Sequence, residues 1–266
     1  MPEAPAPEGR SRIVLYAAWV LGGLLLIPGW RFNHPLFLWI NGRHGAAADA
    51  VLGVISGLGD GLVAVVLLTA LMLWRFKTGL AGMAAYALSG ILAQILKHLF
   101  DMPRPPAVFD HVHVLGAALT SRSFPSGHAA TDGTMAVLCL YLWGMRDGRA
   151  WAGVALYLAA AYGRIYGGVH FPFDVLTGLM LGWISMVLCW RGLQHPRVAP
   201  RVASWARSVW GWRTPAMLLV TEAVVLGMGY RIQPSTAQPL AFGLSVMALA
   251  WVMLSWRIRH GNQGSL

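Results

Sequence analysis

Long apolar stretches alternate with short polar connections along most of the chain. A transmembrane helix needs ~20 mostly apolar residues, with a range of about 17–25. Eight stretches meet or approach this length: residues 13–30, 55–74, 79–96, 128–145, 150–166, 173–190, 215–230 and 239–256. The seventh stretch is short and contains Glu222, so it is the weakest of the set. The pattern predicts an all-α fold, a polytopic transmembrane helical bundle.

The polar segments divide this bundle into parts. A Pro-rich start predicts a disordered tail, and a basic stretch after the sixth span predicts a cytoplasmic linker. The predicted parts are a tail at 1–12, a six-span core at 13–190, the linker at 191–214, two additional spans within 215–256 and a tail at 257–266. Residues 31–56 are mixed in character and predict a partly interfacial helix.

Composition supports a membrane protein. Hydrophobic residues make up 57% of the chain and charged residues 11%, whereas a soluble domain is about 25% charged. The net charge of +10 lies in the connections rather than in the apolar stretches, so it indicates membrane topology and not nucleic-acid binding. Cys139 and Cys189 both fall in apolar stretches, which gives no reason to expect metal or redox chemistry.

The distribution of lysine and arginine predicts the orientation. If the N-terminus is cytoplasmic, thirteen of these residues lie on the cytoplasmic side and seven on the other. The seven are Arg31, Arg43, Lys97, Arg104, Arg122, Arg164 and Arg231. The positive-inside rule therefore predicts a bacterial-type inner (plasma) membrane protein with both termini in the cytoplasm. Polar residues in the outer connections would then face the periplasmic, or extracytoplasmic, side.

Two outer connections carry the candidate chemistry. The first begins with KHLFDMPRPP and ends with SRSFPSGHAA, and the second reads GRIYGGVHFPFD. Lys97, Arg104 and Arg164 offer one point charge and two planar guanidinium forks, which suit the oxygens of a phosphate. Ser126 adds a hydroxyl, and Gly127 allows close backbone approach at a helix N-terminus, where N–H groups favour anions.

Two histidines and a carboxylate complete this set. Asp174 lies four residues after His170, so it can bind one imidazole nitrogen and leave the other as a nucleophile. His128 can then protonate the leaving oxygen. These parts indicate phosphoryl transfer through a phosphohistidine, which requires no metal or other cofactor.

The spacing K-x6-R-P, P-S-G-H and R-x5-H-x3-D resembles the three-part signature of the type 2 phosphatidic acid phosphatase superfamily. The resemblance covers about residues 55–190. It implies a six-helix core with His170 as nucleophile, His128 as general acid and Asp174 as the orienting carboxylate. It also implies phosphate binding by Lys97, Arg104, Arg164, Ser126 and the backbone of Gly127. The family commonly has a serine where this chain has Gly163, and the last two spans are an addition to its usual core.

The sequence is consistent with two roles for each of several other polar residues. Asp132 either holds the imidazole of His128 from one helical turn away or is satisfied by its helix neighbours. Arg122 either helps to bind a second phosphate or headgroup or is only a loop charge. Glu222 is either functional or protonated and packed in the bundle. The histidines that flank the first connection show no metal-ligand pattern and are expected to be solvent-accessible: His98, His111 and His113.

The sequence thus predicts a membrane phosphatase that acts on a lipid phosphate or diphosphate at the outer leaflet. Candidate substrates are polyprenyl diphosphate, which is the first choice, phosphatidylglycerophosphate, phosphatidic acid and lipid A phosphates. The apolar spans disfavour the soluble haloperoxidase branch of the family. The alternatives are a lipid phosphotransferase that uses the same phosphohistidine, and a non-catalytic lipid-binding or transport protein. The expected partners are the lipid substrate and the bilayer, not nucleic acid, and the sequence does not indicate an oligomeric state.

Overall fold

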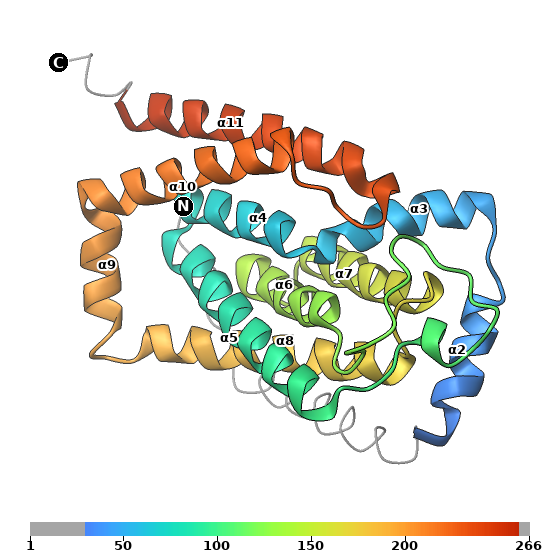
Figure 1. The fold of residues 1–266 in the computed structure, drawn as a ribbon. Coiled ribbons are helices and arrows are strands. Elements are labelled where there is room, and N and C mark those ends of the chain that lie inside the picture. The colour runs from blue at the N-terminus through green and yellow to red at the C-terminus, as the bar shows by residue number, and fades with distance from the viewer. Residues whose placement is uncertain (1–29, 261–266) are drawn as a thin grey trace.

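Residues 30–260 are described by the structure, a computed structural model, and within that range the chain is helical and contains no β-strand (Figure 1). This confirms the predicted all-α class. The α-helices are α2 (Asn33–Asn41), α3 (Ala46–Ser56), α4 (Gly61–Trp74), α5 (Phe76–Phe100), α6 (Gly127–Trp143), α7 (Gly148–Tyr166), α8 (Pro172–Gln194), α9 (Ala199–Arg207), α10 (Val209–Met228) and α11 (Gln238–His260). Short 3-10 helices are η1 (Trp30–Phe32), η2 (Gly57–Gly59), η3 (Pro105–Ala107) and η4 (Ser235–Ala237). The predicted tail at 1–12 and nearly all of the first predicted span lie outside the described residues, as does most of the second tail.

The helices form layers around α6. In Figure 1, α10 and α11 lie above α4, α6 and α7 lie in the middle, and α5 and α8 lie below them. Helix α6 packs against α5, α7 and α8, and 14 of its 17 residues are buried. Because its neighbours shield it on every side, α6 need not present an apolar surface to lipid.

Fewer of the described helices are long and apolar enough to span a membrane than the sequence predicts. Among the described residues, three segments are long and apolar enough to cross a bilayer, namely Phe76–Ala107, Pro172–Gln194 and Ser235–Arg259. A bent pair, Ala46–Gly59 with Gly61–Trp74, would make a fourth. Helix α6, with 17 residues, is short for a membrane span. In α7 and α10, glycine, arginine and other polar residues lie between the apolar ones. Of these three helices only α6 is largely buried; α7 and α10 expose large hydrophobic side chains such as Leu158 and Met217.

The second predicted span is not a straight helix. The structure divides residues 55–74 between the end of α3, η2 and α4, with a bend of 60°. Asp60 stabilises the start of α4, because its side chain accepts hydrogen bonds from the backbone N–H groups of Leu62 (2.9 Å) and Val63 (3.4 Å). Two glycines at the bend, Gly57 and Gly59, let other side chains approach the backbone closely.

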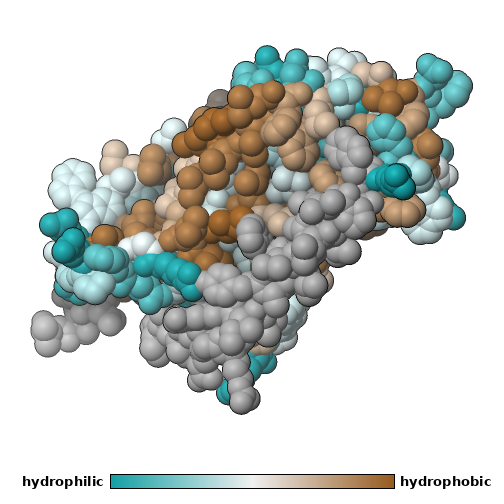
Figure 2. Space-filling model, turned by 90° about the horizontal axis from the view of Figure 1, so that it is seen from below, coloured by the Kyte–Doolittle hydropathy of each residue, from teal (hydrophilic) through white to brown (hydrophobic). Residues whose placement is uncertain are grey.

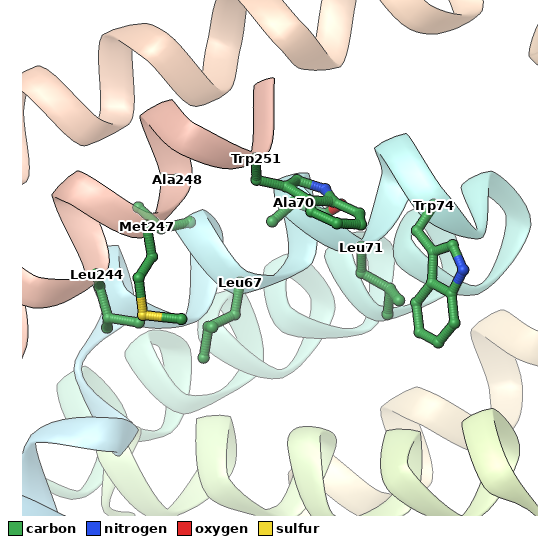
Figure 3. Close-up of a pocket in the computed structure, with 9 residues that line it drawn as sticks. Leu67, Ala70, Leu71, Trp74, Leu244, Met247, Ala248 and Trp251 are labelled. Carbon is green, nitrogen blue, oxygen red and sulfur yellow. The ribbon is translucent and has the colours of Figure 1, made fainter. Parts of the chain in front are cut away.

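The two C-terminal helices pack on α4. Trp251 of α11 donates a hydrogen bond from its indole N–H to the carbonyl oxygen of Ala70 (3.0 Å). Thr69 of α4 donates to Oε1 of Glu222 in α10 (3.0 Å), so this carboxyl group is packed inside the bundle. Between α4 and α11 an apolar groove of about 300 Å³ remains (Figure 3), and Leu67, Trp74 and Trp251 are among the residues that line it.

The boundaries of these C-terminal parts differ from the predicted ones. Helix α10 begins at Val209 rather than at 215, and Pro215 lies inside the helix. The predicted linker at 191–214 contains α9, which has no buried residue and carries Arg201 and Arg207. It lies at the left edge of Figure 1, at the opposite end of the molecule from α2 and α3.

One face of the molecule is apolar between two hydrophilic ends (Figure 2). Figure 2 shows the molecule from below Figure 1, with hydrophobic residues across the middle of this face and hydrophilic residues toward its left and right ends. Helix α8 has 23 residues and is therefore ~34 Å long at 1.5 Å per residue, enough to cross the ~30 Å hydrocarbon core of a bilayer.

Candidate active site

The predicted site residues lie at one end of the helices, on four different elements. Lys97 lies in the last turn of α5, and Ser126 immediately precedes α6. Arg164 lies in the last turn of α7, and Asp174 lies in the first turn of α8. The structure therefore brings together, at the right-hand side of Figure 1, residues that are up to 77 positions apart in the sequence.

Close contact between α6 and α8 fixes the distance between two of these elements. Three glycines allow it, because a Cβ atom at Gly133 would overlap the backbone of α8, and one at Gly178 or Gly182 would overlap the backbone of the α6 segment. At the site end, the N–H of Ser126 donates to the carbonyl oxygen of Asp174 (2.9 Å). The Pro-Ser-Gly-His turn is thus attached directly to the start of α8.

His170 lies in the turn between α7 and α8 and is 2% exposed. Its Nδ1 is 3.4 Å from Oδ2 of Asp174. The same carboxylate oxygen accepts hydrogen bonds from the backbone N–H of Phe171 (2.8 Å) and the hydroxyl of Ser123 (2.5 Å). Because these bonds hold the carboxylate in place, its lone pairs favour the His170 tautomer that carries a proton on Nδ1. The other nitrogen, Nε2, then keeps its lone pair.

Ser123 is a site residue that the sequence analysis did not identify. Its hydroxyl lies between Asp174 and His170, 3.4 Å from the Nδ1 atom of the imidazole, and its side chain is fully buried. The sequence feature that could have indicated Ser123 is its position three residues before Ser126, in the stretch that contains the Pro-Ser-Gly-His turn.

Arg104 faces the free nitrogen of His170. Its Nη1 lies 3.3 Å from Nε2 of His170 and donates to the carbonyl oxygen of Val169 (3.0 Å). Its Nε donates to the carbonyl oxygen of Ser121 (2.9 Å). The guanidinium is therefore held by loop carbonyls on either side, at the position where a phosphate bonded to Nε2 would need a cation.

Lys97 braces the loop that carries this site. Its ammonium group donates to the carbonyl oxygens of Arg122 (2.6 Å) and Ser123 (3.3 Å), and it is 7% exposed. The side chain of Arg122 points away from these contacts and is exposed, with its Nε 3.8 Å from Oδ1 of Asp101. In this structure, Arg122 thus contributes its backbone to the site and its charge to the surface.

The Ser126 hydroxyl has a helix-capping role in the structure. It accepts a hydrogen bond from the N–H of Ala129 (3.3 Å) and is fully buried. Its own proton remains available to a phosphate oxygen. A Cβ at Gly127 would meet no atom within 4 Å, so space for a ligand adjoins the N-terminus of α6.

The two interpretations of Asp132 both differ from the structure. Within the described residues, neither carboxylate oxygen of Asp132 has a hydrogen-bond partner. The same holds for Nε2 of His128. The carboxylate points instead toward the bend before α4, where a Cβ at Gly59 would lie 2.9 Å from either oxygen. The positive charge of Arg164 interacts electrostatically with the carboxylate of Asp132. Because Gly59 leaves room for the carboxylate, Asp132 turns toward the bend rather than along its own helix to His128.

Arg164 contacts a residue from the same bend region. Its Nη1 donates to the hydroxyl of Ser56 (3.4 Å) at the end of α3. A Cβ at Gly163 would lie 3.1 Å from Cβ of Ser56. A hydroxyl from α3 therefore lies beside Arg164, next to the position where the family commonly has a serine.

Burial and three cations determine the protonation of His170. Desolvation lowers the pKa of this imidazole well below its ordinary value, and Arg104, Arg164 and Lys97 lower that pKa further. A neutral His170 is the form that retains a lone pair for attack on phosphorus. The surroundings of the turn thus favour the nucleophilic state at neutral pH.

The remaining predicted polar residues lie outside this cluster. His98 is exposed and contacts the carbonyl oxygen of Gln94, and His111 is also exposed. His113 differs from the expectation of a free loop histidine, because its Nε2 lies 3.0 Å from Oδ1 of Asp49. Across residues 30–260, no three His, Cys, Asp or Glu side chains group closely enough to hold a metal ion.

Comparisons with known proteins show which family the chain resembles. A sequence model described as the PAP2 superfamily matches residues 78–197, which include every predicted catalytic and phosphate-binding residue. An undecaprenyl-diphosphatase of Sulfolobus acidocaldarius is 28% identical over 164 residues, which are 59% of this chain and 76% of that protein. The undecaprenyl-diphosphatase BcrC of Bacillus subtilis is 30% identical over 167 residues, 60% of this chain and 83% of that protein. The crystal structure of Aquifex aeolicus LpxE superposes with a TM-score of 0.57 at 31% identity, covering 60% of this chain and 95% of that one.

Proposed function

We propose that this chain, which belongs to the PAP2 superfamily, hydrolyses a lipid phosphate or diphosphate through a phosphohistidine on His170. One observation carries the proposal: the carboxylate of Asp174 holds Nδ1 of His170 while Arg104 faces Nε2. This arrangement supplies an oriented nucleophile with a cation beside the atom that attacks.

In the first step, Nε2 of His170 attacks the phosphorus atom. Arg104 transfers its hydrogen bond from the imidazole to the phosphate oxygens, where Lys97 and Arg164 add positive charge as these oxygens become more negative. The bond between phosphorus and the leaving oxygen breaks. His128 takes up a proton when the anionic substrate offsets the charge of the neighbouring cations, and donates it to that oxygen as general acid, so a lipid alcohol or a lipid monophosphate departs.

In the second step, water attacks the phosphohistidine. His128, now neutral, accepts a proton from this water as general base. The bond between phosphorus and Nε2 breaks, its electron pair returns to His170, and inorganic phosphate leaves. Each step uses residues that the fold gathers at the same end of the bundle.

The proposed site faces the outer leaflet. Support comes from the ends of α8: Asp174 lies at its start, and Arg191 with the basic helix α9 lies at or beyond its other end. Arg75 also belongs to that far end, because its guanidinium donates to the carbonyl oxygen of Leu142 near the C-terminus of α6. A cytoplasmic position for the basic end places the catalytic end on the extracytoplasmic side.

A polyprenyl diphosphate is our first choice of substrate. Two relatives are named undecaprenyl-diphosphatases, while two others are named lipid A 1-phosphatases. A site with several cations suits a polyanionic headgroup, which favours the diphosphate. Phosphatidylglycerophosphate, phosphatidic acid and lipid A phosphates present a similar terminal phosphate and belong in the same assay.

The test is phosphate release by detergent-purified protein in EDTA, with each of these four lipid classes as substrate. His170→Ala is the decisive variant, and His98→Ala is a matched control because that histidine is exposed at the end of α5. We expect wild-type and His98→Ala proteins to turn over and His170→Ala to lose activity. Equal activity in His170→Ala would show that His170 is not the nucleophile. Substrate consumption that requires a second lipid, with the phosphoryl group recovered on that lipid instead of as inorganic phosphate, would indicate a phosphotransferase.

A further inference from the structure

An open pocket of about 420 Å³ lies beside the buried site, between the last turns of α5 and the loop that precedes α6. Lys97 and Arg104, which we assign to the reacting phosphate, form its inner wall. The rest of the lining that matters here is polar and belongs to Gln94, Thr120, Ser121 and Arg122. The pocket therefore connects the catalytic cations with the surface.

The charge of this pocket exceeds what one phosphate needs. Three cations line it and no carboxylate does. Arg104 and Lys97 are turned inward and nearly buried, whereas the side chain of Arg122 is 56% exposed. The only carboxylate near Arg122 among the described residues is the exposed Asp101 at 3.8 Å, and such a surface pair contributes little. Arg122 is thus free to exchange this partner for an anionic group in the pocket.

The backbone holds Arg122 in an uncommon conformation. Its φ is 55°, in the left-handed region that few residues other than glycine, asparagine and aspartate adopt. Its carbonyl oxygen accepts the hydrogen bond from Lys97 (2.6 Å). Arg122 thus contacts Lys97 through its carbonyl oxygen. Its exposed side chain belongs to the outer part of the pocket lining.

Helix α5, whose last turns border the pocket, also carries an exposed apolar face. Ile91, Ile95 and Leu99 follow one another at intervals of four residues and are 60%, 51% and 72% exposed. Residues at this spacing share one face of a helix. Leu119, which also lines the pocket, is exposed as well. A hydrocarbon tail that leaves the pocket would therefore meet the apolar side chain of Leu119 at the pocket itself.

We infer that the pocket binds the phosphate that is not transferred in a lipid diphosphate, and that Arg122 is the residue that selects diphosphates over monophosphates. This inference rests on the proposed phosphatase function and specifies its substrate class. The terminal phosphate lies at His170, and the phosphate next to the lipid chain lies between Arg122, Lys97 and the hydroxyls of Thr120 and Ser121. A lipid monophosphate reaches His170 without occupying the outer part of the pocket.

The test compares two substrates with the same prenyl chain, one a diphosphate and the other a monophosphate. Arg122→Asn removes the charge, and asparagine tolerates a positive φ. We expect kcat/KM for the diphosphate to fall by on the order of ten- to a hundredfold, as for a lost hydrogen bond to a charged group. The monophosphate should change less than about threefold, since a surface charge that does not contact substrate contributes little.

Two further variants serve as references. Arg231→Asn removes an exposed arginine from a loop at the same end of the molecule and should leave both substrates unaffected. Arg122→Lys should recover part of the activity on the diphosphate. Inhibition gives an independent readout: inorganic pyrophosphate should inhibit the wild type more strongly than inorganic phosphate, and Arg122→Asn should remove that difference.

The results distinguish a failure of the inference about Arg122 from a failure of the proposed phosphatase function. Equal losses on both substrates in Arg122→Asn would make Arg122 a residue of general structural importance, and no loss on either would remove it from the site; both results overturn the inference. A wild type that turns over only monophosphates would overturn the inference and leave the proposed phosphatase function intact. A wild type that releases phosphate from neither substrate nor the other lipid classes would refute the proposed function itself.

Discussion

The imidazole of His170 has a different partner at each of its two nitrogens. Nδ1 faces the carboxylate of Asp174, which Ser123 and Phe171 hold by hydrogen bonds. Nε2 faces Arg104. Because a carboxylate accepts but does not donate, and a guanidinium donates but does not accept, only the neutral tautomer with its proton on Nδ1 satisfies both. The residues around the turn thus determine which nitrogen is available for attack.

The pH dependence of activity should reflect the burial of this imidazole. Desolvation, together with Arg104, Arg164 and Lys97, lowers the pKa of His170 below the ordinary value of about 6.5. A lowered pKa means that the neutral form persists as the pH falls, so activity should decline only well below pH ~6.5. The measurement is kcat/KM against pH, with the ionisation of the lipid substrate determined separately by phosphorus NMR. An acid limb at or above pH ~6.5 that does not follow the substrate would contradict the assignment.

Ser123 should act as a positioning residue through Asp174. Its hydroxyl donates to the carboxylate at 2.5 Å, and hydrogen bonds to charged groups contribute about 1.5–3 kcal/mol. We expect Ser123→Ala to lower kcat by on the order of tenfold or more, with little change in KM, because the change affects orientation of the nucleophile rather than substrate contacts. Ser123→Thr, which retains the hydroxyl, should recover part of kcat. A rise in KM with kcat unchanged would instead assign Ser123 to substrate binding.

At this scale, sequence predicts the residue types better than their partners. The spacing identified His170 and Asp174, and the structure brings them to within 3.4 Å. It did not identify Ser123, whose role depends on a loop folding back over α8. It also gave Asp132 the wrong choices of partner, because the space that Gly59 leaves for its carboxylate lies on another element.

At the scale of single elements, glycine spacing on α8 controls how closely the site can assemble. Gly178 and Gly182 lie on the face of α8 that touches α6, where added Cβ atoms would overlap α6-segment backbone. The start of α6 carries Ser126 and His128, and the start of α8 carries Asp174. Any separation of the two helices would therefore move His128, the proposed general acid, away from Asp174, which contacts the proposed nucleophile His170.

Gly182→Ala should destabilise the protein and reduce activity together. The new methyl group would overlap the carbonyl oxygen of Ala130, and overpacking of this kind costs about 1–3 kcal/mol. Gly192→Ala is a matched control on the same helix, because a Cβ there meets no atom within 4 Å; it should be neutral or slightly stabilising. Thermal unfolding in detergent measures both variants. Equal melting temperatures for the two would mean that α6 and α8 are not held as closely as the structure shows.

The elements themselves were predicted where apolar residues run without interruption. Helices α5, α8 and α11 contain the third, sixth and eighth predicted stretches, and all three qualify as membrane spans. The bend of 60° after α3 was not predicted. Its cause is the capping of α4 by Asp60 within an otherwise apolar stretch, and hydropathy averages such a residue away.

At the scale of the whole molecule, the two ends of the bundle have different chemistry. One end gathers His128, His170 and the phosphate-binding cations, and the other carries the arginines of α9 and of the neighbouring helix ends. An apolar surface lies between them (Figure 2). This polarity supports a transverse orientation in the bilayer with the catalytic end outside.

Cysteine labelling tests that orientation. Asp110→Cys places a thiol in the exposed loop near the site, and Arg201→Cys places one on the exposed α9. A maleimide that cannot cross membranes should label Asp110→Cys in intact spheroplasts and should label Arg201→Cys only after permeabilisation. The unaltered protein gives the background, since Cys139 is buried and Cys189 is partly buried. The reverse pattern would place the site in the cytoplasm.

The arrangement of the C-terminal pair on α4 was beyond prediction from sequence. The sequence indicated two more spans but not the helix against which they pack, since contacts such as Trp251 with Ala70 join residues 181 positions apart. Glu222 shows the same limit. Its hydrogen-bond partner, Thr69, lies 153 positions away in the sequence.

The central claim is that His170 carries the phosphoryl group during turnover, and trapping that group tests it most directly. In His128→Ala, a phosphorylated substrate with a good leaving group should still phosphorylate the enzyme, because such a group leaves without protonation, while attack by water lacks its general base. After rapid quenching we expect an acid-labile, base-stable phosphate on the protein, located at residue 170 by peptide mapping and absent from the double variant His128→Ala/His170→Ala. Label retained in the double variant, or located at another residue, would contradict the account.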